Sequence, residues 1–521
     1  MLIENIIFWP IYALLWAAVV RYDVHMFQHN SYRTERYFNW FPKGYKFLRA
    51  ATILLLAIAA IFSNPILYGV VALLMLIIAY REFRTTYKVP LAYTMRVKRL
   101  ILTTLLLTLA VLFLAWRFIP QYMPCVALLL LTMPVLMLSA NIVNRPVEAA
   151  ISRWYYNDAK RILRSMPDLT IIGITGSFGK TSTKNYLYRI LSEQYNVLMT
   201  PGNFNTTLGV VRTIREHLKP YHQIFIVEMG AKQTGDIKEI CDLVHPTIGI
   251  VTAVGEMHLE TFHSVDNIFA TKFELIEALP KDGMGVINID SEHIASRIGH
   301  YNRPCHVISY GVHNHDADYR AANIAYASSQ TSFDVDFRGE IRDGYATHLA
   351  GRGNILNLLA AIAVADKLGL AESLQKRAIR QIEQIEHRLS IKRAAGGVTI
   401  LDDAYNSNPA GAQMALEVLQ HFERPTSGRR VVVTPGFVEL GERQEALNRE
   451  LGQQIAGACD VAIIVNMTNR AALTAGLADR AFPKEQTIEV ASLNEALAYM
   501  ATMLRAGDVV LYENDLPDSF K

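Results

Sequence analysis

The sequence contains few cysteines and carries almost no net charge. The cysteines are too few and too far apart for a metal site, and the small net charge does not favour nucleic-acid binding. Its four cysteines, Cys125, Cys241, Cys305 and Cys459, lie far apart and include no CxxC pair. This spacing gives neither a zinc site nor a disulfide framework, and it fits a reducing compartment. The net charge of +3 over 521 residues provides no global basic field, so no nucleic-acid partner is expected.

The sequence also lacks an internal repeat, a low-complexity tract and a cleavable signal peptide. Apolar runs continue well beyond the first one, which argues against a signal peptide. A chain of 521 residues is long enough for two or three domains. The uneven distribution of its apolar residues divides it into an apolar first part and a mixed second part.

Long apolar runs fill the first 144 residues, at about 2–20, 48–63, 65–80, 100–119 and 122–143. Crossing a bilayer takes about 20 apolar residues. The second and third runs are shorter and meet at Ser63-Asn64-Pro65, as in a helical hairpin. We therefore predict a transmembrane domain of about five helices over residues 1–144. A buried hairpin of a soluble core is the alternative, but no polar face interrupts these runs.

Basic residues predict how this domain is oriented. They gather in the loops at 21–49 and 81–99, whereas the turn at 63–64 has none. Positive loops stay in the cytoplasm, so we expect a multi-pass protein of the cell (inner) membrane with its N-terminus outside and the chain after about residue 144 in the cytoplasm. Aromatic residues near the helix ends suit the membrane interface: Trp9, Tyr45, Tyr80, Trp116 and Tyr122. Membrane lipids are expected partners, and ordinary positive-inside bias explains the basic loops more simply than a head-group site does.

After residue 144 the pattern changes to alternating strands and helices. A helical linker is predicted at 145–168. Strand-like apolar runs follow at 169–174, 224–228, 248–252, 284–289, 398–402, 430–434, 461–465 and 508–512. Such alternation indicates an α/β fold with mainly parallel sheets. A break near 386–397 separates a central domain (169–386) from a C-terminal domain (387–521).

The segment ITGSFGKTSTK (174–184) follows the first of these strands. The strict pattern GxxxxGK[ST] fails because Ile174 stands at the first glycine position. A strand, TGSxGKT and a helix remain, and they meet the physical requirements for binding phosphate: mobile glycines, a helix N-terminus, a lysine and a hydroxyl for Mg²⁺. A glycine-rich strand–helix turn is the alternative. The candidate phosphate-binding residues are Thr175, Gly176, Ser177, Gly179, Lys180, Thr181 and Ser182.

This loop and the motifs after it resemble the Mur ligase family, the ATP-dependent amide ligases of peptidoglycan precursors. The further motifs, in the family's order, are TPGNFNTTLGV (200–210), FIVEMGAKQTGDI (225–237), GEMHLETF (255–262), ATKFELI (270–276), INID (287–290), GRGNILN (351–357), EHRLSI (386–391) and LDDAYNSNP (401–409). The substrate loop at 200–210 is most like that of the branch that adds D-alanyl-D-alanine to the muramyl tripeptide. The resemblance covers about 350 residues and implies a P-loop central domain and a Rossmann-like C-terminal domain.

The resemblance also implies the site. Thr181, Glu228, His258 and a carbamylated Lys272 would hold two Mg²⁺ ions. Asn288 would contact adenine, Asn354 and Asn357 would lie near the nucleotide, Arg388 would face the γ-phosphate and Asp403 the ribose. ATP would phosphorylate a carboxylate of an envelope precursor, and the amine of an amino acid or dipeptide would then attack the acyl phosphate. The catalytic candidates are Lys180, His258, Lys272 and Arg388.

Three departures from the family pattern limit this interpretation. The UDP-binding domain that normally precedes the P-loop is replaced by the apolar region, which makes a lipid-carried acceptor plausible. Gly353 stands where the family has histidine. The end YENDLPDSFK replaces the family's KGS-type loop, and Glu513, Asp515 and Asp518 are candidates for receiving an ammonium group, with a solvated acidic tail as the simpler alternative.

Rival functions remain open. A ligase of another envelope polymer, such as a poly-γ-glutamate-like chain, fits the same motifs. A non-catalytic ATP-binding membrane scaffold is disfavoured because a pure binder needs no second metal. A transporter is disfavoured because no charge interrupts the apolar spans.

Overall fold

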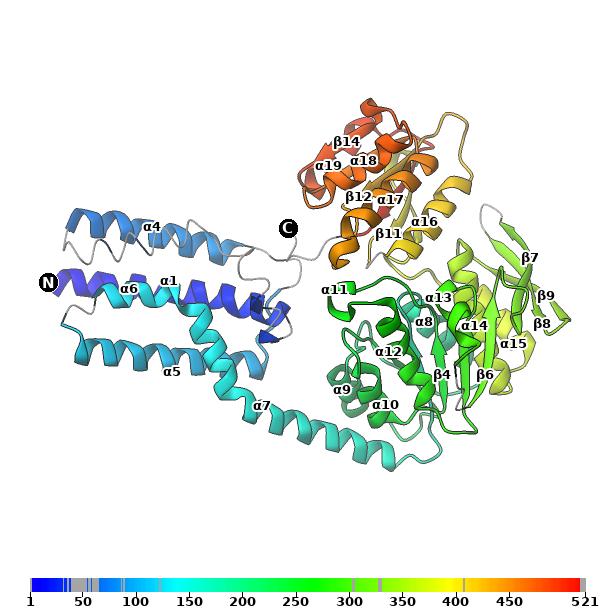
Figure 1. Ribbon diagram of the computed structural model, residues 1–521, viewed down its shortest axis with the longest axis horizontal. Coiled ribbons are helices and arrows are strands. Elements are labelled where there is room, and N and C mark those ends of the chain that lie inside the picture. Colours follow the sequence, from blue (N-terminus) through cyan, green and yellow to red (C-terminus); the bar gives the residue numbers. More distant parts are fainter. Residues whose placement is uncertain are drawn as a thin grey trace. The chain divides into compact units, whose positions relative to one another are not determined.

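A computed structural model describes residues 2–30, 32–34, 37–38, 54, 58, 65–85, 87, 90–120, 123–301, 305–326, 330–405 and 408–515. The chain divides into two compact units, one formed by residues up to Trp154 and the other beginning at Tyr155 (Figure 1). The first is helical and the second contains both sheets. Each unit is described by itself.

The first unit consists of helices that share an apolar core. The described helices are α1 (Leu2–His29), α4 (Pro65–Arg84), α5 (Met95–Phe118), α6 (Met123–Leu131) and the first part of α7 (Met133–Arg164), which continues past Trp154 into the second unit. Side chains from each long helix meet in the core, including Leu15, Val71, Leu100 and Met137. Two buried threonines of α5, Thr104 and Thr108, donate to the carbonyls four residues earlier, at 2.8 Å in both cases. These bonds satisfy hydroxyls that would otherwise be costly among apolar groups.

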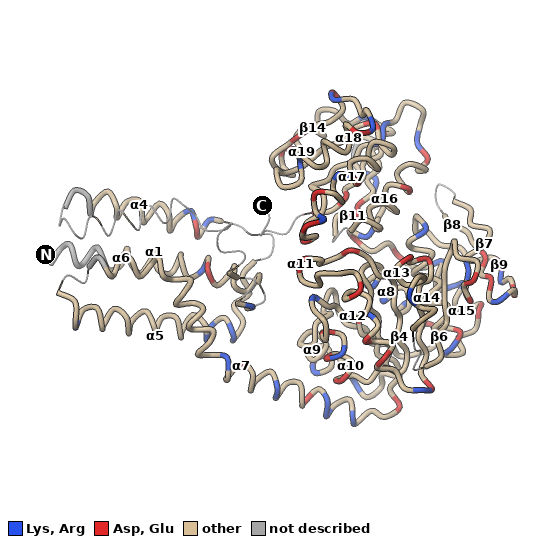
Figure 2. Tube along the Cα trace, viewed as in Figure 1, with Lys and Arg blue, Asp and Glu red and all other residues tan. Residues whose placement is uncertain are grey.

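Among the described residues, α5 is the one helix long and apolar enough to cross a membrane. It has no charged residue between Arg99 and Arg117, and its trace in Figure 2 is tan over most of its length. Its large apolar side chains are mostly exposed: Leu102, Leu106, Leu109, Phe113 and Trp116. The predicted span at 48–63 lies outside the described residues apart from Leu54 and Ile58. The predicted spans at 2–20 and 65–80 remain predictions.

The predicted span at 122–143 is not one helix. α6 ends at Leu131, and α7 begins at Met133 and continues to Arg164. Pro134 lacks an N–H to donate to the preceding turn, so a new helix begins there more readily than the old one continues. Residues 145–164 of the predicted helical linker are thus the second half of α7, whereas residues 165–168 lie after the end of that helix.

The second unit begins with a sheet that is largely parallel. Within the described residues its order is β2-β3-β1-β4-β5-β6-β7-β8-β9. The strands are β1 (Thr170–Thr175), β2 (Val197–Met199), β3 (Ile224–Glu228), β4 (Ile248–Val251), β5 (Met284–Asn288), β6 (His306–Gly311), β7 (Tyr319–Tyr326), β8 (Thr331–Phe337) and β9 (Glu340–Thr347). β1 lies between β3 and β4, so the loop after it leaves the middle of the parallel part.

Helices cover both faces of this sheet (Figure 1). They are α8 (Lys180–Leu191), α9 (Thr207–His217), α10 (Asp236–Val244), α11 (Leu259–Phe262), α12 (Val265–Glu277), α13 (Glu292–Ile298), α14 (Arg352–Lys367) and α15 (Glu372–Arg380). Alternate residues of β1 belong to different cores: Ile172 and Ile174 pack with α8 and α14, and Ile171 packs with α9, α10 and α12. This alternation follows from the two-residue period of a strand.

A second sheet follows, in the order β10-β11-β15-β12-β13-β14 among the described residues. Its strands are β10 (Ser390–Arg393), β11 (Thr399–Asp403), β12 (Arg430–Thr434), β13 (Val461–Val465), β14 (Thr487–Val490) and β15 (Val509–Glu513). The accompanying helices are α16 (Pro409–His421), α17 (Gln444–Ala458), α18 (Arg470–Asp479) and α19 (Leu493–Met503), with short 3₁₀ turns η1 (Ala395–Gly397), η2 (Gly441–Arg443) and η3 (Lys484–Gln486). All strands except β10 pair in parallel. The predicted α/β architecture is confirmed.

Candidate active site

The loop between β1 and α8 has a backbone that only glycine accepts at two positions. Gly176 has φ +146° and Gly179 has φ +81°. A Cβ on Gly176 would lie 2.1 Å from Thr252 Oγ1, and one on Gly179 would lie 2.6 Å from Asn357 Oδ1. Neither distance is possible for real atoms, so both glycines are required sterically. The loop ends where the N–H groups of α8 begin, a favourable place for an anion.

Neighbouring segments hold this loop in place. Ser177 N donates to Ala253 O at 2.8 Å, and Ser177 Oγ donates to Gly255 O at 3.1 Å. Thr175 Oγ1 donates to Met229 O at 3.0 Å. These two predicted cofactor-binding side chains therefore shape the loop in the structure.

Lys180, the first residue of α8, folds back over the loop. Its ammonium donates to Gly176 O at 2.7 Å and to Ser177 O at 3.3 Å. Burial lowers the pKa of Lys180, Glu228 counteracts this and Arg388 adds to it, giving about 8. An anion bound at the loop would replace these carbonyls and favour the charged amine.

Glu228 is the buried acid at the end of β3. Its Oε1 accepts hydrogen bonds from Thr181 Oγ1 and from Asn205 Nδ2, both at 3.2 Å. Its Oε2 forms an ion pair with Lys184 Nζ at 3.0 Å. Burial raises the pKa of Glu228, but the charges of Lys184 and Lys180 outweigh burial, so the pKa lies below its usual value and the carboxylate is ionised.

The pair formed by Thr181 and Glu228 fits a magnesium ion. Two oxygens bound side by side to octahedral Mg²⁺ at about 2.0–2.1 Å lie about 3 Å apart. The observed separation of Thr181 Oγ1 and Glu228 Oε1 is 3.2 Å. The described residues contain no group of three or more His, Cys, Asp and Glu side chains arranged to hold a metal. The fit therefore depends on a hydroxyl and one carboxylate, with the remaining positions left to water or phosphate.

Lys184 was not among the candidates predicted from the sequence. It lies four residues after Lys180, on the same face of α8, and its side chain is 1% exposed. Besides Glu228, its ammonium contacts Gly202 O at 2.6 Å. The spacing of two lysines on the inner face of one helix was the available signal.

Lys272 lies on α12 and is 4% exposed. Its ammonium lies 5.7 Å from the centre of the Phe262 ring. Burial lowers the pKa of Lys272 to about 7, with repulsion from Lys180 adding to the shift and Asp236 and Glu274 opposing it. A buried amine that is partly neutral near pH 7 is a suitable nucleophile for carbon dioxide.

His258 has a partner from the C-terminal domain. It precedes α11 with φ +53°, and its Nδ1 lies 2.5 Å from Glu439 Oε2. Glu256, two residues earlier, forms an ion pair with Arg443. The structure thus brings Thr181 and Glu228 of the predicted metal set together, and it pairs His258 with Glu439.

The three predicted nucleotide asparagines are held by the protein's own hydrogen bonds. Asn288 Nδ2 donates to Thr252 O at 2.9 Å. Asn354 Oδ1 accepts from Tyr186 Oη at 2.7 Å, and Asn357 Oδ1 accepts from Thr183 Oγ1 at 3.1 Å. Ser182 lies on α8 directly before Thr183 and is buried. Asn357 and Thr252 adjoin the phosphate loop, so Asn357 and, through Thr252, Asn288 support that loop, whereas Asn354 supports α8 through Tyr186.

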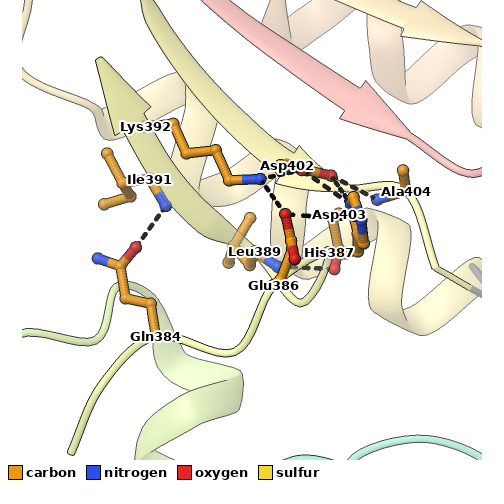
Figure 3. A network of polar contacts seen from close by, with 9 residues as sticks. All are labelled: Gln384, Glu386, His387, Leu389, Ile391, Lys392, Asp402, Asp403 and Ala404. Carbon is orange, nitrogen blue, oxygen red and sulfur yellow. Dashed lines mark hydrogen bonds and ion pairs between the residues drawn. The ribbon is translucent and has the colours of Figure 1, made fainter.

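Asp403 belongs to the polar network of Figure 3 at the start of the C-terminal domain, and Arg388 directly precedes Leu389 of that network in the chain. Asp402 accepts hydrogen bonds from His387 and Lys392 in that network. Asp403 accepts the backbone N–H of Leu389 at 2.9 Å, and burial raises the pKa of Asp403 to about 6 despite the charge of Arg388.

Arg388 also connects this region to the loop at 200–206. Its guanidinium carbon lies 4.5 Å from the centre of the Tyr405 ring. The Tyr405 hydroxyl accepts a hydrogen bond from Asn203 Nδ2 at 3.2 Å. Arg388 is therefore held beside a loop that the sequence motifs assign to the substrate.

Two departures from the family pattern have structural explanations. A Cβ on Gly353 would lie 3.1 Å from Met414 Sδ of α16, so a histidine there would require the Met414 side chain to shift. Glu513 is fully buried and lies opposite Asp403 in the backbone register of the parallel strands β15 and β11. The alternative of a solvated acidic tail is therefore wrong for Glu513. Asp518 lies outside the described residues.

The fold and this site together define a class of protein. A parallel sheet with a glycine-containing phosphate loop before its first long helix, followed by a second mostly parallel domain, is the architecture of a P-loop nucleotide-binding protein. Comparison with known proteins then gives the family. Residues 174–365 match the Mur ligase middle domain, and residues 387–512 match the Mur ligase, glutamate ligase domain.

The relatives agree with this match. The UDP-N-acetylmuramoyl-tripeptide–D-alanyl-D-alanine ligase of Escherichia coli is 30% identical over 324 residues, covering 60% of this chain and 70% of that protein. The ligase of the same name from Bacillus subtilis is 29% identical over 286 residues, covering 55% of this chain and 60% of that protein. The chain belongs to the Mur ligase family.

A solved structure supports the fold. The MurF ligase of Thermotoga maritima in complex with ADP superposes with a TM-score of 0.60 at 24% identity, covering 70% of this chain and 80% of that one. Both family matches lie after residue 173. The helical first unit lies outside them.

Proposed function

We propose that this chain is a membrane-anchored ligase of peptidoglycan-precursor synthesis that uses ATP and Mg²⁺ to form an amide bond. The observation that carries the proposal is the meeting of Lys180, Thr181 and Glu228 at the start of α8. Thr181 and Glu228 offer Mg²⁺ two oxygens at a fitting separation, and Lys180 lies over a loop built around anion-binding backbone groups.

The family resemblance gives each of these residues a role, and we adopt these roles in the proposal. Lys180 and Arg388 would offset negative charge on the terminal phosphates of ATP, and Thr181 and Glu228 would hold one ion. Asp403 and Asn288 would orient the nucleoside. Bound Mg²⁺ would supply positive charge beside the transferred phosphoryl group, which is chiefly what phosphoryl transfer requires.

Lys272 would carry the carbamate that this family's motif implies. Its neutral amine would add to carbon dioxide, forming an N–C bond and releasing one proton, so that a cationic side chain becomes a carboxylate-like oxygen ligand. Hard Mg²⁺ prefers oxygen ligands. The buried position and the pKa of about 7 support this step. His258 would join the same site after leaving Glu439.

The proposed reaction has two steps. The carboxylate of the acceptor takes the γ-phosphoryl group and ADP leaves. The amine then attacks the acyl carbon, phosphate leaves and the nitrogen loses a proton. The names of the relatives suggest a UDP-N-acetylmuramoyl-tripeptide as acceptor and D-alanyl-D-alanine as amine. We take residues 169–386 as the ATP-binding domain and 387–521 as the C-terminal ligase domain.

We place the chain in the membrane through its first 144 residues. The exposed apolar surface of α5 and its uncharged length support this placement. The basic residues that begin α5, Arg96, Lys98 and Arg99, favour a cytoplasmic position for that end. The linker at 145–168 would connect the membrane part to the ligase domains.

Phosphate release by the full-length protein tests the reaction. With ATP, Mg²⁺ and bicarbonate, release is expected to require both the muramyl tripeptide and D-alanyl-D-alanine. Lys180→Met is expected to lower turnover by about 10²–10³-fold, as losing another electrostatic stabiliser does. Lys238→Met removes an exposed lysine of α10 and is the matched control. No ligated product in the presence of both substrates would overturn the choice of substrates.

Alkaline carbonate extraction of cell membranes tests the placement. The full-length chain is expected to stay in the membrane pellet. Quantitative release into the supernatant would contradict the proposed membrane domain.

A further inference from the structure

The buried ammonium of Lys184 lies between two parts of the proposed site. One is the acid that would hold magnesium, whose Oε2 lies 3.0 Å from Lys184 Nζ. The other is the loop of residues 200–206, here called the acceptor loop, whose Gly202 O lies 2.6 Å from the same nitrogen. An ammonium that is 1% exposed needs such partners, because burying an unpaired charge is costly.

The acceptor loop is tied to Glu228 and its neighbours at further points. Glu228 N donates to Thr200 Oγ1 at 3.1 Å, and Gly230 N donates to Asn205 O at 2.7 Å. Asn205 Nδ2 donates to Glu228 Oε1 at 3.2 Å. A Cβ on Gly230 would lie 2.8 Å from Asn205 Cγ, so the loop lies directly against the end of β3.

Lys184 determines which carboxylate oxygen of Glu228 remains available to bind a magnesium ion. Its ammonium occupies the side of Oε2, and Oε1 therefore faces Thr181, where the oxygen pair fits Mg²⁺. Lys180 does not replace it in the structure, because Lys180 bonds to the carbonyls of its own loop. Without Lys184, Glu228 would lose its direct cationic partner and Gly202 O would lose its donor.

We infer that Lys184 is a positioning residue that fixes the acceptor loop and the magnesium-binding carboxylate to one point. This inference rests on the proposed function for the role of the loop. The carboxylate-bearing acceptor would then bind to a loop whose order depends on the same ammonium that orients Glu228. Magnesium–nucleotide binding and acceptor binding are thereby coupled through one side chain.

Two measurements on the full-length protein test the inference without requiring turnover. The first is amide hydrogen exchange of residues 200–206, and the second is the Mg²⁺ concentration that gives half-maximal binding of a fluorescent ATP analogue. Lys184→Met is expected to speed exchange in the loop at least about tenfold and to raise the Mg²⁺ midpoint by about tenfold, an equilibrium change equal to losing one charged hydrogen bond.

The control variants separate position from charge. Lys184→Arg keeps the charge and is expected to restore part of both properties. Lys238→Met, on the surface of α10, is expected to change neither. A folded Lys184→Met protein with unchanged loop exchange and an unchanged Mg²⁺ midpoint would overturn the inference.

A second comparison applies if Lys184→Met does not fold, because that variant leaves Glu228 as a buried charge. Glu228→Gln and the double variant Lys184→Met/Glu228→Gln bury no unpaired acid. Loop exchange is expected to be faster in the double variant than in Glu228→Gln, since only the single variant keeps the bond to Gly202 O. Equal rates of loop exchange in these two variants would refute the inference that Lys184 fixes the acceptor loop. These measurements do not depend on the substrate assay, so they test the role of Lys184 even if the proposed reaction is not observed.

Discussion

Replacing Lys272 by methionine should make the protein more stable, although it removes a proposed catalytic group. The Lys272 side chain is 4% exposed and its pKa is lowered from 10.5 to about 7, chiefly by burial. Below pH 7 the amine is protonated in both the folded and unfolded states, and the native state carries the full cost of the buried charge. Between pH 7 and 10.5 the unfolded chain binds the extra proton, so the free energy of unfolding rises with pH.

The size of the effect follows from the two pKa values. Each unit of difference is worth about 1.4 kcal/mol, so burying the charge costs about 4 kcal/mol at pH 7 and about 2 kcal/mol at pH 9. Lys272→Met has a similar length and no charge. It should therefore gain about 4 kcal/mol at pH 7 relative to the wild type, and the gain should halve by pH 9.

Pulse proteolysis in urea can measure this gain in the full-length protein, with fragments from residues 170–290 as the readout and bicarbonate excluded from the buffer. Lys281→Met, an exposed lysine shortly after α12, is the control, and it should stay within about 0.5 kcal/mol of the wild type at every pH. Adding bicarbonate should stabilise the wild type and leave Lys272→Met unchanged. A destabilised Lys272→Met protein, or a gain that does not vary with pH, would refute the reasoning.

Two further predictions concern the loops. Gly176→Ala places a Cβ 2.1 Å from a neighbouring oxygen and should weaken ATP binding at least about tenfold in a calorimetric titration. The control Gly235→Ala has φ +91° and nothing within 4 Å of its Cβ, so it should bind ATP normally. Equal losses of ATP affinity in the two variants would show that backbone strain alone is responsible. Asn448→Ala removes hydrogen bonds to Phe437 N (2.8 Å) and Phe437 O (3.1 Å) and should lower the free energy of unfolding in urea by about 2–3 kcal/mol. The control Glu450→Ala, on the exposed face of α17, should lower it little. A similar loss of stability in both variants would show that Asn448 does not specifically support the loop that contains Phe437.

The buried parallel strands could be predicted from the sequence, because such strands are covered on both faces and therefore consist of apolar residues. The runs at 169–174, 224–228, 248–252 and 284–289 correspond to β1, β3, β4 and β5, and they read as continuous apolar segments. The strands β2, β6 to β10 and β14 were missed. Of these, β7 to β9 pair antiparallel with one another, and their exposed faces carry polar residues, so their apolar content is low.

The first part of the chain shows the opposite limit. Apolar content predicts that a helix forms, but it does not say where one helix ends and the next begins. The run at 122–143 is divided at Thr132, and α7 continues to Arg164 through the predicted linker. Pro134 lacks a backbone N–H, and this determines the boundary between α6 and α7. A count of apolar residues does not contain that information.

The sequence by itself determined the phosphate loop, the strand that leads into it and the order of the ligase motifs, because spacing along the chain fixes glycines, lysine and hydroxyl relative to one helix. Only the tertiary structure decided which of these groups meet. Glu228 contacts Thr181, Asn205 and Lys184 because β3 lies beside β1 and the loop after β2 folds against its end. His258 meets Glu439 and Lys272 is shielded from water for the same reason: contacts between residues distant in the chain depend on how the strands and helices pack, and no local pattern encodes that packing.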